Sequence, residues 1–262
     1  MDFSRQHEKK ALTGELASRH KVEEEFHDTK ARDGVHDFYE YGALSLADSF
    51  LFSSLGNLRG KRLLEIGCGD GEATVRFAKA GAFITAIDIS GGMVELTKKK
   101  VHEADLDANV VARQMGGEDL DLEQGYFDIV YGHSILHHLN LDIATPKIAR
   151  ALKKGGTAAF LEPLDYNPIL AFFRLLTPHR RTPTEKPLKF SQFKSMAQQF
   201  SNWEHKEFYL FSLGAFFWYY VIRNRSLFQL TLRTLAGFDR LVFKMIPYFR
   251  KYAWVTVVRY IR

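Results

Sequence analysis

A chain of 262 residues, 46% of them hydrophobic, is long enough to bury one substantial core with a small appended cap. Its single cysteine, Cys68, excludes an internal disulfide framework and fits a reducing compartment. The first ten residues are polar and no apolar run follows them, so we expect no secretory signal and a cytoplasmic location. No stretch reaches the roughly 20 apolar residues that a membrane-spanning helix needs.

The net charge of +5 is unevenly distributed along the chain. Residues 1–162 hold 20 Lys and Arg against 26 Asp and Glu, a net charge of −6, whereas residues 163–262 hold 16 against 5, a net charge of +11. A basic, aromatic-rich second half suits an anionic partner such as a membrane surface, an acidic substrate or a nucleic acid. Ordinary solvated faces would carry the same charges without a partner, and composition leaves both interpretations open.

Residues 1–57 have the charged character of peripheral helices, and we expect an N-terminal helical cap there. From residue 58 to residue 165, apolar strands alternate with amphipathic helices. The expected strands are Lys61–Ile66, Ala82–Ile89, Asn109–Met115, Tyr126–Ile135 and Thr157–Leu164, and the expected helices are Gly71–Lys79, Gly92–Ala104 and Ile143–Leu152. This alternation predicts an α/β fold with a doubly wound parallel sheet, helices on both faces, and ligands at the C-terminal ends of the strands.

Residues 166–262 follow a different pattern. Four of the seven prolines fall within residues 167–187, which predicts a loop or linker. Trp203–Phe211 and Tyr252–Ile261 are expected to return to the sheet as edge strands. Between them, Phe208–Ile222 is fifteen residues without a charge, too short to span a membrane and suited to a buried or interfacial helix.

An amphipathic helix is predicted after this uncharged stretch. At about 100° per residue, one stripe holds Phe228, Leu232, Leu235, Val242 and Ile246, and the opposite side holds Arg233, Arg240 and Lys244. Either the stripe packs on the core as a lid over an acceptor pocket, or residues 212–251 lie on a membrane surface as a peripheral contact at the inner membrane. Both interpretations favour an apolar or amphipathic substrate.

The stretch Leu63–Gly71, which reads Leu-Leu-Glu-Ile-Gly-Cys-Gly-Asp-Gly, predicts a strand that feeds a tight turn. Its spacing, Gly-x-Gly-x-Gly, differs from the Gly-x-Gly-x-x-Gly of NAD-binding turns. The carboxylates of Glu65 and Asp70 would repel a pyrophosphate but attract a ligand with an ammonium and a sulfonium group. This argument favours S-adenosylmethionine over NAD.

Asp88 ends the second expected strand, 17 residues after Gly71. A carboxylate at this place can accept hydrogen bonds from both hydroxyls of a ribose, as an acid near the end of the second strand does in dinucleotide-binding folds.

Residues 58–165 resemble the class I, seven-stranded S-adenosylmethionine-dependent methyltransferases. The resemblance is carried by Leu63–Gly71, Ile84–Ser90, Phe127–Val130, Ser134–Leu139, Leu152–Gly156 and Leu161–Pro163. It implies a Rossmann-like, mostly parallel seven-stranded sheet with S-adenosylmethionine as methyl donor and no metal. It implies cofactor-binding roles for Glu65, Gly67, Cys68, Gly69, Gly71, Asp88, Ile89, Met93, Gly116, Gly117, Glu118, Gly132 and His133.

The chain departs from the family pattern after the third strand. Many relatives have an aspartate there that accepts the adenine amino group, but this chain reads Met115-Gly116-Gly117-Glu118. Backbone groups of Gly116 and Gly117, with Glu118 nearby, are the alternative contacts to adenine.

Three histidines, His133, His137 and His138, follow the fourth expected strand, where the family's active site lies. A histidine near its ordinary pKa of about 6.5 can deprotonate an acceptor at neutral pH. The phosphoethanolamine methyltransferases resemble this chain in having a histidine at the position of His137, paired with an N-terminal tyrosine, for which Tyr39 and Tyr41 are the candidates. Packing alone would also explain histidines at these positions.

The predicted function is therefore methylation of a hydrophobic or amphipathic small molecule, natural-product-like or lipid-like. The alternatives are a membrane-surface methyltransferase for phospholipid head groups and a non-catalytic S-adenosylmethionine-binding protein. A nucleic-acid substrate is disfavoured because His133-Ser134-Ile135-Leu136 replaces the Asn/Asp-Pro-Pro-Tyr/Phe motif of amino-methyltransferases. The sequence does not determine the oligomeric state.

Overall fold

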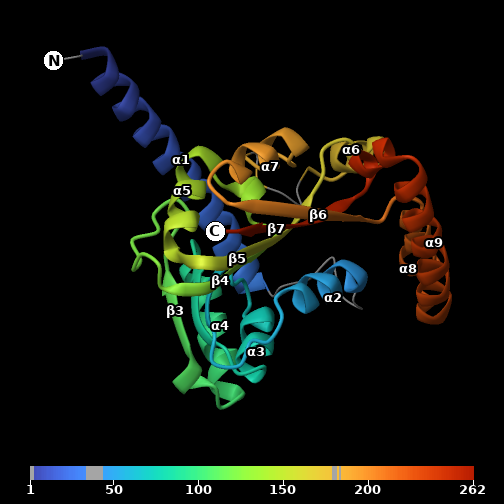
Figure 1. The fold of residues 1–262 in the computed structure, drawn as a ribbon, viewed down its shortest axis with the longest axis horizontal. Helices are drawn as coiled ribbons and strands as arrows, with labels where there is room; N and C mark the ends of the chain where they lie inside the picture. Colours follow the sequence, from blue (N-terminus) through green and yellow to red (C-terminus); the bar gives the residue numbers. More distant parts are fainter. Residues whose placement is uncertain (1–2, 34–43, 179–181, 183) are drawn as a thin grey trace.

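A seven-stranded sheet with helices on both faces organises the molecule (Figure 1). The structure is a computed structural model that describes residues 3–33, 44–178, 182 and 184–262, with side chains from Gly14 onward. None of the helices in these ranges combines the length and the apolar character that crossing a bilayer requires.

The sheet has the strand order β3-β2-β1-β4-β5-β7-β6. Its strands are β1 Arg62–Ile66, β2 Phe83–Asp88, β3 Val110–Gln114, β4 Phe127–His133, β5 Leu152–Pro163, β6 Asn202–Phe208 and β7 Val255–Ile261. The chain therefore reverses direction across the sheet between β1 and β4, the switch point beside which ligands bind in folds of this kind. The glycine turn that follows β1 lies at that point.

The sheet is mixed, which corrects the expectation of a parallel sheet. Strands β1 to β5 pair in parallel, but β7 is antiparallel to both of its neighbours, β5 and β6. Of the two strands expected at the edge, only β6 lies there. β7 is inserted between β5 and β6, with Val258 opposite Phe160 on one side and His205 on the other. Between β6 and β7 the chain stays at one end of the sheet. β7 therefore runs antiparallel to β6, because no crossover returns the chain to the other end.

Nine helices are assigned within the described ranges. They are α1 Phe3–Asp33, α2 Ser45–Ser54, α3 Glu72–Lys79, α4 Gly91–Glu103, α5 Leu141–Ala151, α6 Pro168–Leu176, α7 Phe190–Ala197, α8 Phe216–Tyr220 and α9 Arg225–Met245. Side-chain caps begin several of them: Ser90 accepts from the Met93 amide at 3.0 Å, and Asn224 accepts from the Leu227 amide at 2.9 Å. Short 3₁₀ helices lie at Leu136–His138 (η2), Phe211–Ala215 (η4) and Pro247–Tyr252 (η5).

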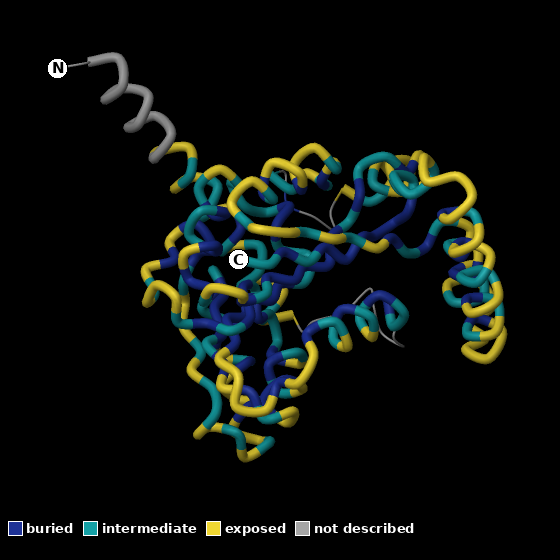
Figure 2. Tube along the Cα trace, in the orientation of Figure 1, coloured by how far each residue is buried: buried dark blue, intermediate teal, exposed yellow. Residues whose placement is uncertain are grey.

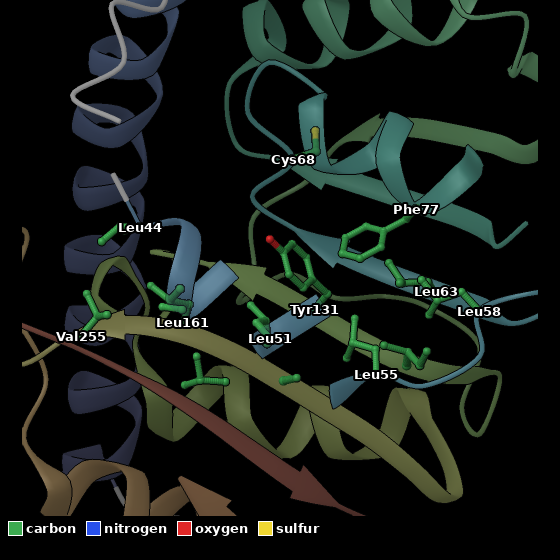
Figure 3. Packing of buried hydrophobic residues seen from close by; sticks show 14 of the residues in the cluster. Leu44, Leu51, Leu55, Leu58, Leu63, Cys68, Phe77, Tyr131, Leu161 and Val255 are labelled. Atoms are coloured by element: carbon green, nitrogen blue, oxygen red, sulfur yellow. The ribbon is translucent and has the colours of Figure 1, made fainter. Parts of the chain in front are cut away.

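Buried apolar side chains form one cluster on each face of the sheet. On one face, Leu51 and Leu55 of the α2 region pack with Phe77 of α3 and Tyr131 of β4 (Figure 3). The Phe77 and Tyr131 rings meet edge to face, with centroids 4.6 Å apart. On the other face, Ile148 of α5 joins residues of α7. The helices that cover both faces thus hold the strand ends in fixed positions.

The proline-rich stretch is not simply a loop, because it contains α6. Asn167 caps this helix by accepting from the amides of Ile169 and Leu170, and Pro168 occupies its first turn, where no backbone donor is needed. A proline in that position initiates a helix instead of breaking it, which the proline count did not reveal.

The amphipathic helix predicted after residue 227 is α9, but Ile246 does not belong to its buried stripe. Phe228 and Leu232 are fully buried, whereas Ile246 follows the end of the helix and is 48% exposed. The stripe also contains a buried acid, Asp239, which accepts hydrogen bonds from the amides of Leu210, Phe211 and Ser212. Asp239 therefore caps the start of η4 and fixes α9 against it.

Candidate active site

The turn after β1 has a backbone that only glycine adopts without strain. Gly67, Gly69 and Gly71 all have positive φ, at 75°, 52° and 82°. At Gly71 an added Cβ would lie 2.8 Å from the Cα of Thr97 in α4, so a side chain would push α4 away. At Gly69 an added Cβ would meet no protein atom within 4 Å, so a ligand can approach this backbone closely.

Cys68 lies inside the turn and is buried. The Thr97 hydroxyl lies 3.3 Å from the Cys68 sulfur and donates to the Gly69 carbonyl at 2.9 Å. Burial raises the pKa of the Cys68 thiol far above its usual range. Cys68 is therefore an apolar packing residue of the turn and not a reactive thiol.

Asp88 holds the turn from the end of β2. Its two carboxylate oxygens accept from the Gly69 amide and from the Ser90 amide, each at 2.9 Å. Burial raises the pKa of Asp88, and the two backbone donors oppose that rise. Because each oxygen has a further lone pair, the carboxylate keeps acceptor capacity for the two hydroxyls of a ribose.

Glu65 does not supply the negative charge expected from the sequence. Its side chain is buried behind the turn and accepts from the Thr74 hydroxyl of α3 at 2.5 Å. Burial, with smaller contributions from Asp88 and Asp70, raises the pKa of Glu65 to about 8, so the group is largely protonated at neutral pH. Asp70, the other acid of the turn, is partly exposed and forms an ion pair with Lys100.

The loop after β3 is closed by α1. Glu118 is buried and accepts from Arg19, from His20 at 3.1 Å and from the Asn140 amide at 2.7 Å. Burial raises the pKa of Glu118, but these donors and the Arg19 charge outweigh it and leave that pKa below its ordinary value. Gly116 and Gly117 are also buried beside these residues, so the stretch expected to contact adenine forms one wall under α1.

The start of α4 forms a second contact with α1. Asp28 accepts from the Gly92 amide at 3.0 Å and from the Ser90 hydroxyl. Met93 is buried one residue further on, and the Ile89 carbonyl accepts from Gln114 at 3.0 Å. Two of the predicted cofactor residues, Ile89 and Met93, therefore flank Asp88 at the end of β2.

The end of β4 brings two predicted residues to the opposite side of the turn. At Gly132 an added Cβ would lie 2.5 Å from Ile135, so the strand requires glycine there. His133 Nε2 lies 3.0 Å from a carboxylate oxygen of Asp48 in α2. His133 thus connects the sheet to the first helix that covers it.

His137 is paired with a buried carboxylate. Its Nδ1 lies 2.7 Å from Glu162 Oε2, while Glu162 Oε1 accepts from the amides of Ile135 and Leu136. Since Glu162 accepts at both oxygens, Nδ1 of a neutral His137 donates and Nε2 keeps its lone pair. Nε2 faces Glu185, at 3.9 Å. Tyr39 and Tyr41, the predicted partners of His137, lie outside the described residues.

His138 points toward α1 instead. Its Nδ1 lies 3.0 Å from Glu23, whose other oxygen accepts from the hydroxyls of Thr182 and Thr184. Burial raises the pKa of Glu23, but His138 and the two threonines outweigh it and lower the pKa to about 2. Burial, followed by the charge on His138, lowers the pKa of His27 to about 4.

Ligand atoms of Glu23, His27 and His138 lie within 4.8 Å of one another, as do those of His137, His138 and Glu185. In the first group, Glu23 is paired with His138 and accepts hydrogen bonds from the hydroxyls of Thr182 and Thr184.

Sequence reasoning missed the contribution of α1 and of Glu162. The signal for α1 was the spacing of Arg19, Glu23 and His27 at four-residue intervals, which places them on one helix face. The signal for Glu162 was a single acid at the end of an otherwise apolar strand. Both patterns can be recognised in the sequence, but the partners lie 25 to 161 residues away in the chain and only the fold identifies them.

Comparison with known proteins finds similarity over part of the chain. Residues 64–160 match the family described as "Methyltransferase domain". The chain is 36% identical over 102 residues to 27-O-demethylrifamycin SV methyltransferase of Amycolatopsis mediterranei, and 32% identical over 129 residues to a ubiquinone biosynthesis O-methyltransferase of Alkalilimnicola ehrlichii. These matches cover 38% and 48% of this chain and 38% and 51% of the relatives, so the chain spans about half of their length or less.

Solved structures share the fold over most of the chain. Geranyl diphosphate C-methyltransferase from Streptomyces coelicolor matches with a TM-score of 0.60 and 14% identity, over 87% of this chain and 85% of that one. Phosphoethanolamine N-methyltransferase 2 of Haemonchus contortus matches with a TM-score of 0.60 and 17% identity, over 82% of this chain and 52% of that one. At such identities the likeness concerns the fold alone.

Proposed function

We propose that this chain, whose residues 64–160 belong to the class I S-adenosylmethionine-dependent methyltransferases, transfers the methyl group of S-adenosylmethionine to a hydrophobic or amphipathic small molecule. The family predicted from the motifs is confirmed by the match, and with it the class of methyl donor. The acceptor is the part of the proposal that goes beyond the family.

The observation that carries the proposal is the turn between β1 and α3 with Asp88 beside it. Gly69 presents open backbone, and Asp88 is held beside the turn by two amides and keeps further acceptor capacity. These features fit an adenosyl group, whose ribose hydroxyls need a paired acceptor. Glu118 and the buried glycines before it form the neighbouring wall, where adenine would lie.

The residues after β4 include a side chain that can take up a proton during methyl transfer. When bound, S-adenosylmethionine provides a methyl group that is already activated for displacement, so the chain has to align the acceptor, exclude water and take up a proton where the acceptor releases one. Glu162 holds the His137 ring in one orientation, with Nε2 as the proton acceptor. We infer that His137 is the general base and Glu162 the residue that positions it.

The aromatic side chains beyond the sheet support an apolar acceptor. Tyr209, Phe216 and Trp254 are buried together where β5 ends and β7 begins, with Phe216 and Trp254 centroids 5.2 Å apart. The Tyr209 hydroxyl accepts from the Leu46 amide at 3.1 Å and ties α2 to this group. The relatives whose names include demethylrifamycin and ubiquinone biosynthesis support a small-molecule acceptor.

Calorimetric titration with S-adenosylmethionine tests the donor site. The Asp88→Asn variant replaces one acceptor oxygen with an amide donor that faces the amides of Gly69 or Ser90, so we expect affinity to fall at least about tenfold, or roughly 1.4 kcal/mol. Asp121→Asn, an exposed change of the same chemistry, should bind as the wild type does. Unchanged affinity in Asp88→Asn would refute the assignment of the ribose contact.

Transfer of labelled methyl groups to fractionated lipid and small-molecule extracts tests the reaction. Label in an apolar fraction, dependent on the chain and abolished by S-adenosylhomocysteine, is the expected result. Binding of the donor without labelling of any fraction would favour the non-catalytic alternative.

A further inference from the structure

Helix α6 leaves almost its whole apolar surface in solvent. Its sequence is Pro-Ile-Leu-Ala-Phe-Phe-Arg-Leu-Leu, and no residue in it is buried. Ile169, Phe172, Leu175 and Leu176 are 68%, 62%, 78% and 63% exposed. Leu170 packs against the core, but these four side chains stay exposed among the residues that the structure describes, and exposed patches of this kind mark interaction sites.

Helix α9 carries a second apolar stripe, which the sequence analysis did not separate from the first. Leu227, Leu230, Phe238, Leu241 and Met245 repeat at helical spacing on the side away from Phe228 and Leu232, and they are 37% to 71% exposed. Figure 2 shows the outward side of α9 exposed along its length. The helix therefore has three faces: one packed on the core, one apolar and exposed, and between them one that holds Arg233, Arg240 and Lys244.

Helices α6, α8 and α9 belong to one end of the molecule. Asn167, the cap of α6, donates to the Tyr252 carbonyl of η5 at 2.7 Å, and η5 follows α9 directly in the chain. Figure 1 shows α6 beside the end of the segment that contains α8 and α9. All these elements leave the sheet where β5 and β6 end and β7 begins, since Pro163 and Phe208 both pair with Val255. This is the end of the sheet that carries the glycine turn, where an acceptor would enter.

The charges of the segment between β6 and β7 are mostly positive. Residues 209–254 contain seven cations, Arg223, Arg225, Arg233, Arg240, Lys244, Arg250 and Lys251, and a single acid, Asp239. Asp239 is 3% exposed and is occupied in capping η4. The exposed apolar side chains are thus bordered mainly by cations, and the nearby acids Asp165 and Glu207 lie beside Lys189 and Arg250.

We propose that the exposed apolar residues of α6 and α9, together with these cations, form a docking surface for a lipid bilayer with anionic head groups. Apolar side chains would enter the boundary of the acyl region while the adjoining cations contact phosphates, as in helices that lie in a membrane interface. The acceptor would then be an amphipathic molecule taken from that bilayer, an extension that rests on the proposed methyltransferase function.

A second copy of the chain fits this surface less well. Two copies related by a twofold axis would place the same cations opposite one another, and charged residues are depleted in the cores of protein interfaces. Nucleic acid would engage the cations but would leave the leucines and phenylalanines of α6 uncovered.

Co-sedimentation with vesicles tests the docking surface independently of catalysis. The full chain should bind vesicles of phosphatidylglycerol and phosphatidylcholine at low salt, bind pure phosphatidylcholine more weakly, and lose affinity as salt screens the charges. The double variants Phe172→Glu/Leu175→Glu on α6 and Arg233→Glu/Arg240→Glu on α9 should each lower binding at least about tenfold.

Matched controls keep the test specific. Phe83→Glu and Val111→Glu change side chains that are 51% and 49% exposed on the opposite edge of the sheet, and Lys79→Glu reverses an exposed charge on α3. These variants should bind vesicles as the wild type does. Calorimetry with S-adenosylmethionine should give the same affinity for all variants, which shows that they fold and separates this proposal from the assignment of the donor site.

Three results would overturn the proposal: no binding of the wild type to anionic vesicles at low salt, equal losses in the control variants, or a dimer in solution that the α6 and α9 variants dissociate while vesicle binding is absent. Failure of the wild type to bind S-adenosylmethionine would overturn the proposed function and leave membrane docking standing.

Discussion

Glu65 and Asp88 lie near the C-terminal ends of neighbouring strands, but their surroundings give the two carboxyl groups different roles. Asp88 receives two backbone amides and faces the turn. Glu65 receives one hydroxyl and faces the interior, where burial raises its pKa to about 8. One acid is therefore available to a ligand, whereas the other is a largely neutral link between β1 and α3.

The Glu65 carboxyl group should make folding pH-dependent. Its pKa is about 4.5 in the unfolded chain and about 8 in the folded one, so the folded state holds the proton more tightly between these values. The associated stability is complete below about pH 4.5 and is lost as pH rises toward 8. Glu65→Gln keeps the shape and removes the titration, so the wild type should lose a few kcal/mol relative to this variant between pH 5.5 and 8.5.

Urea unfolding followed by circular dichroism, without S-adenosylmethionine, measures this difference. Glu123→Gln, at an exposed position, should follow the wild type at every pH. A constant difference between wild type and Glu65→Gln across this range would contradict the shifted pKa.

The pair of His137 and Glu162 should act in turnover and not in donor binding. Removing a general base costs about a hundredfold in rate, so His137→Ala should lower kcat by about that factor with little change in affinity for S-adenosylmethionine. Glu162→Gln should lower kcat less, because it weakens the contact that orients His137. His102→Ala, an exposed histidine of α4, is the control. Full turnover in His137→Ala would remove the general-base role.

At the scale of elements, α1 is the part of the molecule that closes the site. Its contacts reach the loop after β3 through Glu118, the start of α4 through Asp28, and η2 through Glu23. These contacts are polar and cluster on one helix face. Such a helix is held by specific pairs and not by a broad apolar surface, so single substitutions should loosen it.

The pair between Glu23 and His138 should control that docking. Glu23 has a pKa of about 2, so its contribution is present above about pH 4.5 and fades as pH falls toward 2. The pKa of His138 is raised, because Glu23 outweighs the effect of burial, so its contribution is present below pH 6.5 and is lost at higher pH. Glu23→Gln should therefore weaken α1 docking most between these limits, by about 1–3 kcal/mol.

Amide hydrogen exchange over residues 14–33 at pH 6 measures this docking. Faster exchange is expected in Glu23→Gln, and exchange close to the wild type in Glu25→Gln, whose carboxylate lies on the exposed side of the same helix. Equal exchange in both variants would mean that other contacts hold α1.

At the scale of the whole molecule, the last strand joins two parts of the sheet. β7 pairs with β5 on one side and β6 on the other, so the segment from β6 to α9 is connected to the core through it. Val258 is fully buried in β7, whereas Val111 in the edge strand β3 is 49% exposed. Replacing valine by alanine at each position therefore compares the contribution of a buried strand to stability with that of an edge strand.

Val258→Ala should cost about 2 kcal/mol of unfolding free energy, because it removes buried methyl groups and leaves a cavity between the sheet neighbours. Val111→Ala should cost less than about 0.5 kcal/mol. Denaturant unfolding compares them directly. Similar losses would show that β7 is not part of the cooperative core.

The elements from β1 to β5 were predictable to within a few residues because their signals are local. Asp88, for example, follows an apolar strand in the chain, and the residues of the glycine turn are consecutive. Helix α6 was not predicted, because a count of prolines does not distinguish a loop from a helix that Asn167 caps and Pro168 begins. Glu162 and Glu23 were missed as site residues because each acts on a partner distant in sequence.

The sequence by itself determined the class of fold, the class of donor and the glycine turn after β1, because a backbone conformation that needs three glycines is encoded where it forms. Only the tertiary structure decided which acids are charged, what closes the site and which apolar residues stay exposed. Burial is a property of long-range contacts: the pKa of Glu65, the docking of α1, and the exposed stripes of α6 and α9 all depend on what the rest of the chain leaves uncovered.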